Sequence, residues 1–370
     1  MALIELDLPS SNGRDTISAW MYEPVVPARA VVHLVHGLGE HSRRYLRLIA
    51  RLLDEGFVVV ADDHAGHGRT AMTSGIWADA GEDADRVVVA DEQALRARAA
   101  ERHPDLPYVV FGHSWGSMIA RALAAEPGTA LDGLVLGGIA AGMDGLEQRL
   151  DRAALAALPD PEAPAPEALV QQMFAGFTER YGPDAGPTDW VARSADVVRD
   201  HAADPLNNFG APMSVRFLRG FVALYDAANG PGFYDGLPSD LPVLILAGSE
   251  DPVTGYGEGA YHVANRLIAT GMPTSAPGCG QDSATRCTTS RRSATRSPRR
   301  SSPSSSASSA DAPFPRARER HAMCRSAPAT SGRRSPGRSS PAQKRADRPP
   351  SRRSAGMEPS CQGSRIHATR

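Results

Sequence analysis

The residues best suited to chemistry are the pentapeptide Gly112–Gly116, GHSWG. It follows the apolar run Tyr108–Phe111 and precedes a helical-looking segment, Ser117–Ala125. A strand that turns sharply into a helix through two glycines forces the serine between them into a strained backbone and leaves its hydroxyl exposed above the sheet. The spacing therefore predicts Ser114 as the nucleophile of a nucleophile elbow. The alternative is a glycine-bracketed turn that happens to contain serine.

Two other segments offer the groups that such a nucleophile needs. The loop His36–Ser42, HGLGEHS, follows an apolar run, and its two glycines let the backbone approach without side chains. The turn Gly248–Val253, GSEDPV, follows another apolar run and carries Asp251. Ester hydrolysis needs an activated hydroxyl, a base oriented by a carboxylate, and fixed donors for the carbonyl oxygen. The alternatives are a plain strand-end turn for the first loop and a helix cap for Asp251.

The pattern of apolar runs predicts the elements that position these groups. Alternating residues in Ala2–Leu8 and Thr16–Tyr22 predict an antiparallel edge of two strands. Strands and helices then alternate, which indicates a parallel sheet flanked by helices. The expected strands are 30–35, 57–61, 108–111, 131–137 and 241–248, and the expected helices are 43–55, 83–102, 117–125 and 255–270.

The alternation stops between about residues 141 and 235, where helical segments are separated by Pro and Gly. An insertion after the strand at 131–137 would lie above the carboxyl ends of the strands, where α/β folds bind ligands. We therefore expect residues 141–235 to form a helical cap, with 1–140 and 236–273 as the two parts of one α/β core.

The histidines of residues 1–273 have mostly structural interpretations. His64 and His67 lie in the glycine-rich segment 62–70, which we expect to be a loop, and lack a nearby carboxylate-and-cysteine set, so we expect no metal and no cofactor. His33 lies within a strand and is expected in the core. His113 precedes the nucleophile and should point away from it.

Together HGLGEHS at 36–42, DHAGHG at 63–68, GHSWG at 112–116 and the acid turn at 248–253 resemble monoacylglycerol lipases and related lysophospholipases of the α/β-hydrolase fold. The resemblance covers about residues 1–273. It implies Ser114 as the nucleophile, Asp251 as the acid, and an oxyanion hole formed by the backbone N–H groups of Leu38 and Trp115. Asp204–Leu206 also resembles a cap motif of this family, with a structural role.

The remainder of the chain departs from that family. Residues 274–370 contain no Leu, Val, Tyr or Trp, and they carry 20 Lys and Arg against 5 Asp and Glu, whereas residues 1–273 carry 20 against 37. We expect this Ser/Arg/Pro-rich tail to be disordered, because it cannot bury enough apolar area. The family places its catalytic histidine about 30 residues after the acid, yet positions 274–320 contain none.

One explanation is a frameshift near Pro273. Residues 1–273 contain no Lys, which suggests a GC-rich gene, and such genes read out of frame give Arg, Ala, Pro, Ser and Gly. Permissible codons read in another frame restore a strand, a histidine loop and an amphipathic helix. The recovered histidine would fall across Ala284 and Thr285, neither of which can act as a base.

Two function classes follow. The first is a serine carboxylester hydrolase that acts on monoacylglycerol or lysophospholipid-type esters and is impaired by loss of its catalytic histidine. The second is a non-catalytic binding protein whose basic tail reaches an acidic partner; nucleic acid is not the expected partner. Haloalkane dehalogenases and epoxide hydrolases are less compatible, because they use a carboxylate where Ser114 stands.

Composition bounds the setting of the protein. All four cysteines lie beyond residue 274, so residues 1–273 have no thiol for a disulfide, which suits a reducing compartment. The first residues do not look like a signal peptide, and no apolar run approaches about 18 residues. We expect a cytoplasmic protein, with possible peripheral membrane contact through the cap.

Overall fold

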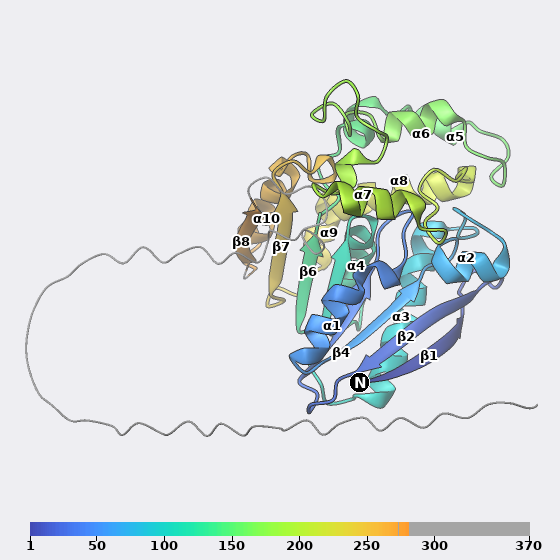
Figure 1. Cartoon of the computed structure of the whole chain (residues 1–370). Coiled ribbons are helices and arrows are strands. Elements are labelled where there is room, and N and C mark those ends of the chain that lie inside the picture. Colours follow the sequence, from blue (N-terminus) through green and yellow to red (C-terminus); the bar gives the residue numbers. More distant parts are fainter. Residues whose placement is uncertain (273, 281–370) are drawn as a thin grey trace, which may run out of the picture. The chain divides into compact units, whose positions relative to one another are not determined.

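The computed structural model describes residues 1–272 and 274–280, which form one eight-stranded sheet flanked by helices (Figure 1). The strand order is β1-β2-β4-β3-β5-β6-β7-β8. The first two strands are antiparallel to their neighbours and the other pairs are parallel. The strands are β1 (Ala2–Pro9), β2 (Thr16–Glu23), β3 (Ala30–Val35), β4 (Phe57–Asp63), β5 (Tyr108–His113), β6 (Gly133–Gly137), β7 (Val243–Gly248) and β8 (Thr274–Gly280). The predicted fold class is confirmed.

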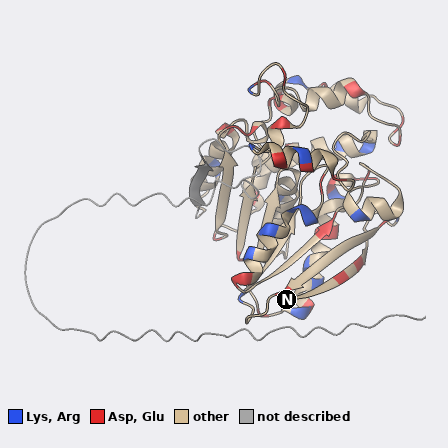
Figure 2. Ribbon diagram, viewed as in Figure 1, with Lys and Arg blue, Asp and Glu red and all other residues tan. Residues whose placement is uncertain are grey.

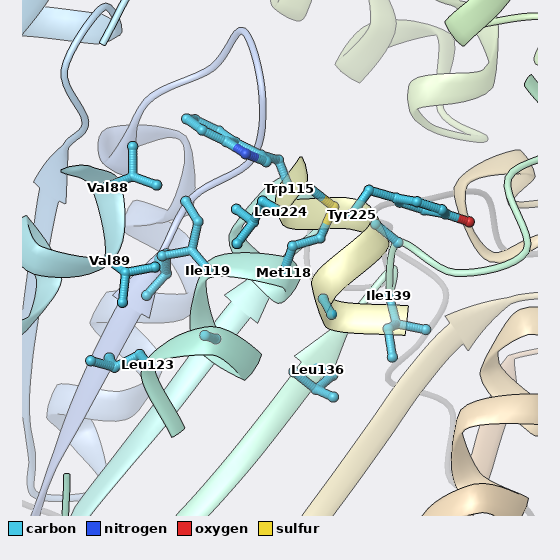
Figure 3. Close-up of a cluster of buried hydrophobic side chains, with 14 of the residues drawn as sticks. Val88, Val89, Trp115, Met118, Ile119, Leu123, Leu136, Ile139, Leu224 and Tyr225 are labelled. Carbon is cyan, nitrogen blue, oxygen red and sulfur yellow. The ribbon is translucent and has the colours of Figure 1, made fainter. Parts of the chain in front are cut away.

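The central strands are continuous apolar runs because helices cover both of their faces. Every residue of β3 is buried. On one face, Tyr45 and the apolar side of α1 (Leu46–Asp54) pack against Trp20 and Leu34. The other face packs against α3 (Ala84–Arg102) and α4 (Trp115–Ala125), and α8 (Val215–Asn229) packs on these two helices. Figure 3 shows this larger core, in which side chains of α4 such as Met118 lie between those of α3, β6 and α8.

The predicted cap range contains two kinds of helix. The outer elements lie above the sheet edge in Figure 1. They are η2 (Gly145–Arg149), α5 (Arg152–Ala156), α6 (Glu167–Met173), η3 (Asp189–Val191) and α7 (Ala195–Ala203). The last two helices, α8 and α9 (Pro231–Gly236), instead pack against the core helix α4, and α8 also packs against α3.

A fully buried arginine joins these parts. The guanidinium of Arg121, on α4, donates to the carbonyl oxygens of Ala228 (3.0 Å) and Ala140 (2.8 Å), and to Asn229 Oδ1 (3.0 Å). Burial lowers the pKa of Arg121 to about 10, so the group stays charged at neutral pH. This one side chain therefore links α4, the end of α8 and the segment that leads into the cap.

Three expectations differ from the structure. The segment 62–70, expected to be a loop, is shorter than predicted, because β4 continues to Asp63 and α2 (Gly68–Ser74) begins at Gly68. The helix predicted at 43–55 begins with the short turn η1 (Ser42–Tyr45) and continues as α1. The helix predicted at 255–270 begins later, at Glu258, as α10 (Glu258–Ala269), after the short turn η4 (Pro252–Thr254).

The third difference concerns the tail. Residues 274–280, the first of the predicted tail, form β8 and pair with β7. The open edge of β7 offers backbone donors and acceptors that an extended segment can satisfy whatever its side chains are. The rest of the predicted tail, from 281 to 370, lies outside the described residues. Among the described helices, none combines the length and apolar character needed to cross a bilayer.

Candidate active site

Ser114 occupies a strained turn between β5 and α4. Its backbone has φ 55° and ψ −120°, a conformation that non-glycine residues rarely adopt. The flanking glycines explain how the turn can close. A Cβ at Gly112 would lie 2.3 Å from the Gly116 carbonyl oxygen, and one at Gly116 would lie 2.3 Å from that of Val35. The Ser114 N–H donates to the Gly137 carbonyl at 3.0 Å, which helps to hold the turn.

The loop after β3 lies directly against this turn. A Cβ on Gly37 would be 3.2 Å from Ser114 Cβ and 3.3 Å from the His113 carbonyl oxygen, so a side chain at this position would crowd the turn. Leu38, Ser114 and Trp115 line the same pocket. Trp115 is the first residue of α4, where backbone N–H groups lack partners within the helix. The structure thus brings the two residues predicted to supply the oxyanion donors to the pocket that contains the predicted nucleophile.

Glu40 fastens this loop from behind and was not singled out by the sequence. Its Oε1 accepts from the Gly37 N–H at 2.9 Å and from the Tyr45 hydroxyl at 2.6 Å, and it lies 3.3 Å from His113 Nδ1. The side chain of Glu40 is buried. One carboxylate oxygen therefore ties the loop after β3 to the residue that precedes Ser114. The position of Glu40 in the loop could have indicated this role, because an acidic side chain three residues after Gly37 can accept a hydrogen bond from the Gly37 N–H.

Asp251 lies at the same edge of the sheet, after β7, and is completely buried. Its Oδ1 accepts from the Val253 N–H at 2.9 Å, and Val253 lines the pocket of Ser114. Asp251 itself does not line that pocket among the described residues. This contact within the turn is the one that the helix-cap alternative expects of Asp251. The catalytic role of Asp251 stays a prediction. Ala284 and Thr285, where the missing histidine was expected, lie outside the described residues.

The histidines near the site make other contacts. His36 and His64 stack with their ring centroids 3.8 Å apart, and His67 packs 5.0 Å from Trp115. Burial and the charge of His64 lower the pKa of His36 well below its usual value and that of His67 to about 3. The packing role expected for His67 agrees with these contacts. His64, however, lies beside two carboxylates, Asp62 and Glu92, which the sequence analysis did not foresee.

The pocket encloses a cavity of about 40 Å³, and its lining is largely apolar. Its floor comes from the core and its walls come from the cap and from α8. The cap and α8 contribute mainly aromatic and aliphatic side chains, namely Met143, Phe174, Phe177, Trp190, Val191, Phe209 and Phe221. Apolar side chains of the cap and of α8 thus surround the space beside Ser114.

The segment Asp204–Phe209 docks the cap onto the loop after β3. The Asn208 N–H donates to the Gly39 carbonyl at 3.1 Å, and a Cβ at Gly39 would be 2.8 Å from Phe209. Asp204 Oδ2 lies 2.9 Å from both His41 Nε2 and Arg44 Nη1. These contacts agree with the structural role that the sequence suggested for Asp204.

Solved structures resemble this architecture. One described as a lipase in its open form is 54% identical, covers 79% of this chain and 94% of its own, and has a TM-score of 0.77. A thermostable carboxyl esterase from Bacillus coagulans, solved with glycerol, is 39% identical, covers 79% of this chain and 94% of its own, and has a TM-score of 0.75.

Sequence relatives agree with the structures. The monoacylglycerol lipase of Mycolicibacterium smegmatis is 32% identical over 64% of this chain and 76% of its own length. The human monoglyceride lipase is 31% identical over 31% of this chain and 36% of its own. The family model described as serine aminopeptidase, S33 (Hydrolase_4), matches residues 26–271. The chain therefore belongs to this family of α/β hydrolases.

Proposed function

We propose that the protein is a serine carboxylester hydrolase of the monoacylglycerol lipase or lysophospholipase kind. The single observation that carries this proposal is the strained Ser114 in a pocket that it shares with the Leu38 and Trp115 backbones. The apolar walls suit an acyl chain, and two of the relatives named above are a monoacylglycerol lipase and a monoglyceride lipase.

In the proposed reaction, Ser114 Oγ adds to the ester carbonyl carbon and its proton passes to a base. The N–H groups of Leu38 and Trp115 would stabilise the negative charge on the carbonyl oxygen. The alcohol then leaves with a proton, and water hydrolyses the acyl-enzyme to release the fatty acid and the free hydroxyl of Ser114. Asp251 would orient the base as one tautomer.

We propose that the base is missing from the chain as it stands, because of the frameshift near Pro273. Removing one member of a triad leaves only the residual rate that comes from binding and the oxyanion hole. The proposed loss of activity rests on the sequence beyond residue 273. The chain as it stands would keep the oxyanion site and the pocket.

The test compares the present chain with one in which a single-base correction near codon 273 restores the other frame. We expect the corrected chain to hydrolyse monoacylglycerol and short p-nitrophenyl esters at least about 10³-fold faster by kcat/KM. The Ser114→Ala variant of the corrected chain should lose that gain. Equal activity of the present and corrected chains would reject the lost-base proposal, and inactivity of both would favour the non-catalytic binding role.

Two parts of the proposal concern its setting. We propose a cytoplasmic location and peripheral contact of the cap with lipid surfaces, since a lipid ester must pass the cap to reach Ser114. Figure 2 shows basic and acidic segments side by side along the cap helices, so binding should not require anionic lipid. Sedimentation with neutral phosphatidylcholine vesicles tests the contact, and protein that stays in the supernatant would contradict it.

A further inference from the structure

A buried group of ionisable side chains lies behind the loop of the oxyanion hole. We call it the histidine–carboxylate cluster; it consists of His33 on β3, Asp62 and His64 at the end of β4, and Glu92 on α3. All four are at most 2% exposed. His33 Nε2 lies 2.7 Å from Glu92 Oε2, and its Nδ1 lies 3.0 Å from the Tyr108 hydroxyl. The proposed reaction uses none of these residues directly.

The contacts of His64 determine its protonation. Its Nδ1 faces two carboxylate oxygens, Asp62 Oδ2 at 3.2 Å and Glu92 Oε1 at 3.1 Å. Its Nε2 faces the His36 carbonyl oxygen at 3.2 Å. Burial and the charge of Glu92 raise the pKa of Asp62 to about 7, whereas His33 and His64 outweigh burial and lower the pKa of Glu92 to about 2. The ionised Glu92 and the His36 carbonyl oxygen can only accept, so we infer that both ring nitrogens of His64 donate and that His64 is an imidazolium. Burial alone would lower the pKa of His64, but the two carboxylates raise it well above its usual value.

His64 in turn fixes the tautomer of His36. The backbone N–H of His64 donates to His36 Nε2 at 3.1 Å, so that nitrogen carries no proton. The proton of the neutral ring is then on Nδ1, which donates to the Gly37 carbonyl oxygen at 2.8 Å. Stacking against His64, with the rings 20° from parallel, holds the His36 ring in this orientation.

The Gly37 carbonyl belongs to the same peptide unit as the Leu38 N–H. Because a trans peptide is planar, its C=O and N–H point in opposite directions. A hydrogen bond that draws the Gly37 oxygen toward His36 therefore directs the Leu38 N–H away from it. Leu38 and Ser114 line one pocket, so the orientation of this peptide would decide whether the Leu38 N–H can donate to the oxyanion of a substrate.

We propose that His64 is a positioning residue for the oxyanion hole. Held by Asp62 and Glu92, the His64 ring stacks on His36 and fixes the orientation of that ring, and through it the direction of the Leu38 N–H. The backbone N–H of residue 64, which His64→Gln retains, sets the tautomer of His36. This inference rests on the proposed function, because it assigns the Leu38 amide to an oxyanion.

A metal ion on Asp62, His64 and Glu92 is the competing interpretation. These residues offer three ligand atoms within 4.8 Å of one another. A metal on His64 Nδ1 would displace the proton that the proposal requires. His64 Nδ1 lies at hydrogen-bond distance from both carboxylates, and the three residues are almost completely buried. This geometry favours a proton on Nδ1 over a metal ion.

The experiment measures oxyanion recognition without needing turnover. Octylboronic acid adds to the hydroxyl of Ser114: a B–O bond forms, the hydroxyl proton goes to solvent, and a tetrahedral anion results. The ether 1-O-octylglycerol places a similar chain in the pocket and forms no anion. Calorimetry measures the affinities of both ligands for the full chain and for its His64→Gln and Glu92→Gln variants. The matched control is His103→Gln, because His103, at the end of α3, also pairs with a carboxylate, that of Glu23.

We expect His64→Gln to weaken boronate binding by about 10- to 100-fold, since a misdirected oxyanion donor costs on that order, and to change ether binding less than about 2-fold. Glu92→Gln should shift boronate binding in the same direction by less, and His103→Gln should change neither ligand. Nitrogen-15 NMR of labelled histidine should show two protonated ring nitrogens on His64.

Equal losses for both ligands, or no loss for the boronate, would overturn the proposal. A neutral His64, or stoichiometric bound metal in the purified chain, would overturn it as well. If His64→Gln does not fold, Glu92→Gln and the NMR spectrum decide. Boronate that binds the unaltered chain and its Ser114→Ala variant equally would instead reject the proposed function.

Discussion

At the scale of single residues, the proposed nucleophile Ser114 has a strained backbone conformation. A non-glycine residue in such a conformation costs about 1–3 kcal/mol, and glycine adopts it freely. We expect Ser114→Gly to be more stable to urea unfolding than Ser114→Ala by about 1 kcal/mol, after allowing for the extra freedom of glycine in the unfolded chain. Both variants remove the hydroxyl of Ser114, so the comparison isolates the effect of the backbone conformation. A Ser114→Gly variant that is less stable than Ser114→Ala would show that the turn is unstrained.

The second residue-scale prediction concerns His67. Burial and the charge of His64 lower its pKa to about 3, and its Nε2 has no hydrogen-bond partner among the described residues. An unfolded histidine titrates near about 6.5. The folded state therefore binds fewer protons, so the stability contributed by neutral His67 is complete above about pH 6.5 and is lost as pH falls toward about 3.

Replacing His67 by Phe should remove this loss and keep the packing on Trp115 and Phe217. We expect the unfolding free energy of His67→Phe to fall less steeply between about pH 6.5 and 4.5, by up to about 1.4 kcal/mol per pH unit. A residual slope of the same sign should remain, because the pKa of His36 is also lowered. His262→Gln, an exposed change on α10, is the control. Parallel curves for unaltered protein and His67→Phe would contradict the prediction.

At the scale of elements, the cap is fastened where Asp204 meets the loop after β3. Hydrogen bonds from His41 and Arg44 outweigh burial and lower the pKa of Asp204 to about 2. A lowered pKa means that this carboxylate stabilises the folded state fully above about pH 4 and loses the effect as pH falls toward about 2. The pair is partly exposed, so its contribution is small, on the order of 1 kcal/mol.

We expect Asp204→Asn to leave the core intact and to loosen the cap. Acrylamide should quench Trp190, which lines the pocket from the cap, more strongly in the variant at pH 7. Protease cleavage within the cap should accelerate by a few-fold. Asp196→Asn, a change at an exposed position of α7, should change neither measurement. Identical quenching in all three proteins would show that Asp204 does not fasten the cap.

The elements also show what the sequence could predict. The apolar runs that became β3 to β7 were recognisable because strands covered on both faces need such side chains. The start of α2 at Gly68 was hidden, because the glycines of that segment resemble a loop. The strand β8 was missed for another reason: its pairing with β7 uses the backbone, about which composition says little.

The candidate site divides in the same way. Ser114, Leu38 and Trp115 were predictable from local motifs, because the glycines that shape each turn are close neighbours of these residues in the sequence. Glu92 was not, since a residue of α3 meets His64 only through the packing of that helix on the sheet. Side chains that meet only through tertiary packing have no characteristic spacing in the sequence from which they could be predicted.

At the scale of the whole molecule, the chain joins an acidic body to a basic end, with 37 Asp and Glu before residue 274 and 5 after it. The frameshift proposal predicts that resequencing the gene around codon 273 reveals one inserted or missing base. The corrected reading should restore acidic and branched apolar residues, and a histidine near positions 284 and 285. Confirmation of the present frame in genomic DNA and in the mass of the purified protein would refute this proposal.

The buried guanidinium of Arg121 determines where this chain can be recombined with a relative. A chimera that exchanges residues 141–235 would bring in a foreign α8, and any shift in its last turn would leave charged donors without the Ala228 and Asn229 oxygens. Losing the partners of a buried charge costs about 3–5 kcal/mol. Junctions placed before η2 and before Ser214, the N-cap of α8, would exchange the outer cap and keep this anchor with its own core. The segment that can be exchanged is therefore shorter than the insertion predicted from the sequence.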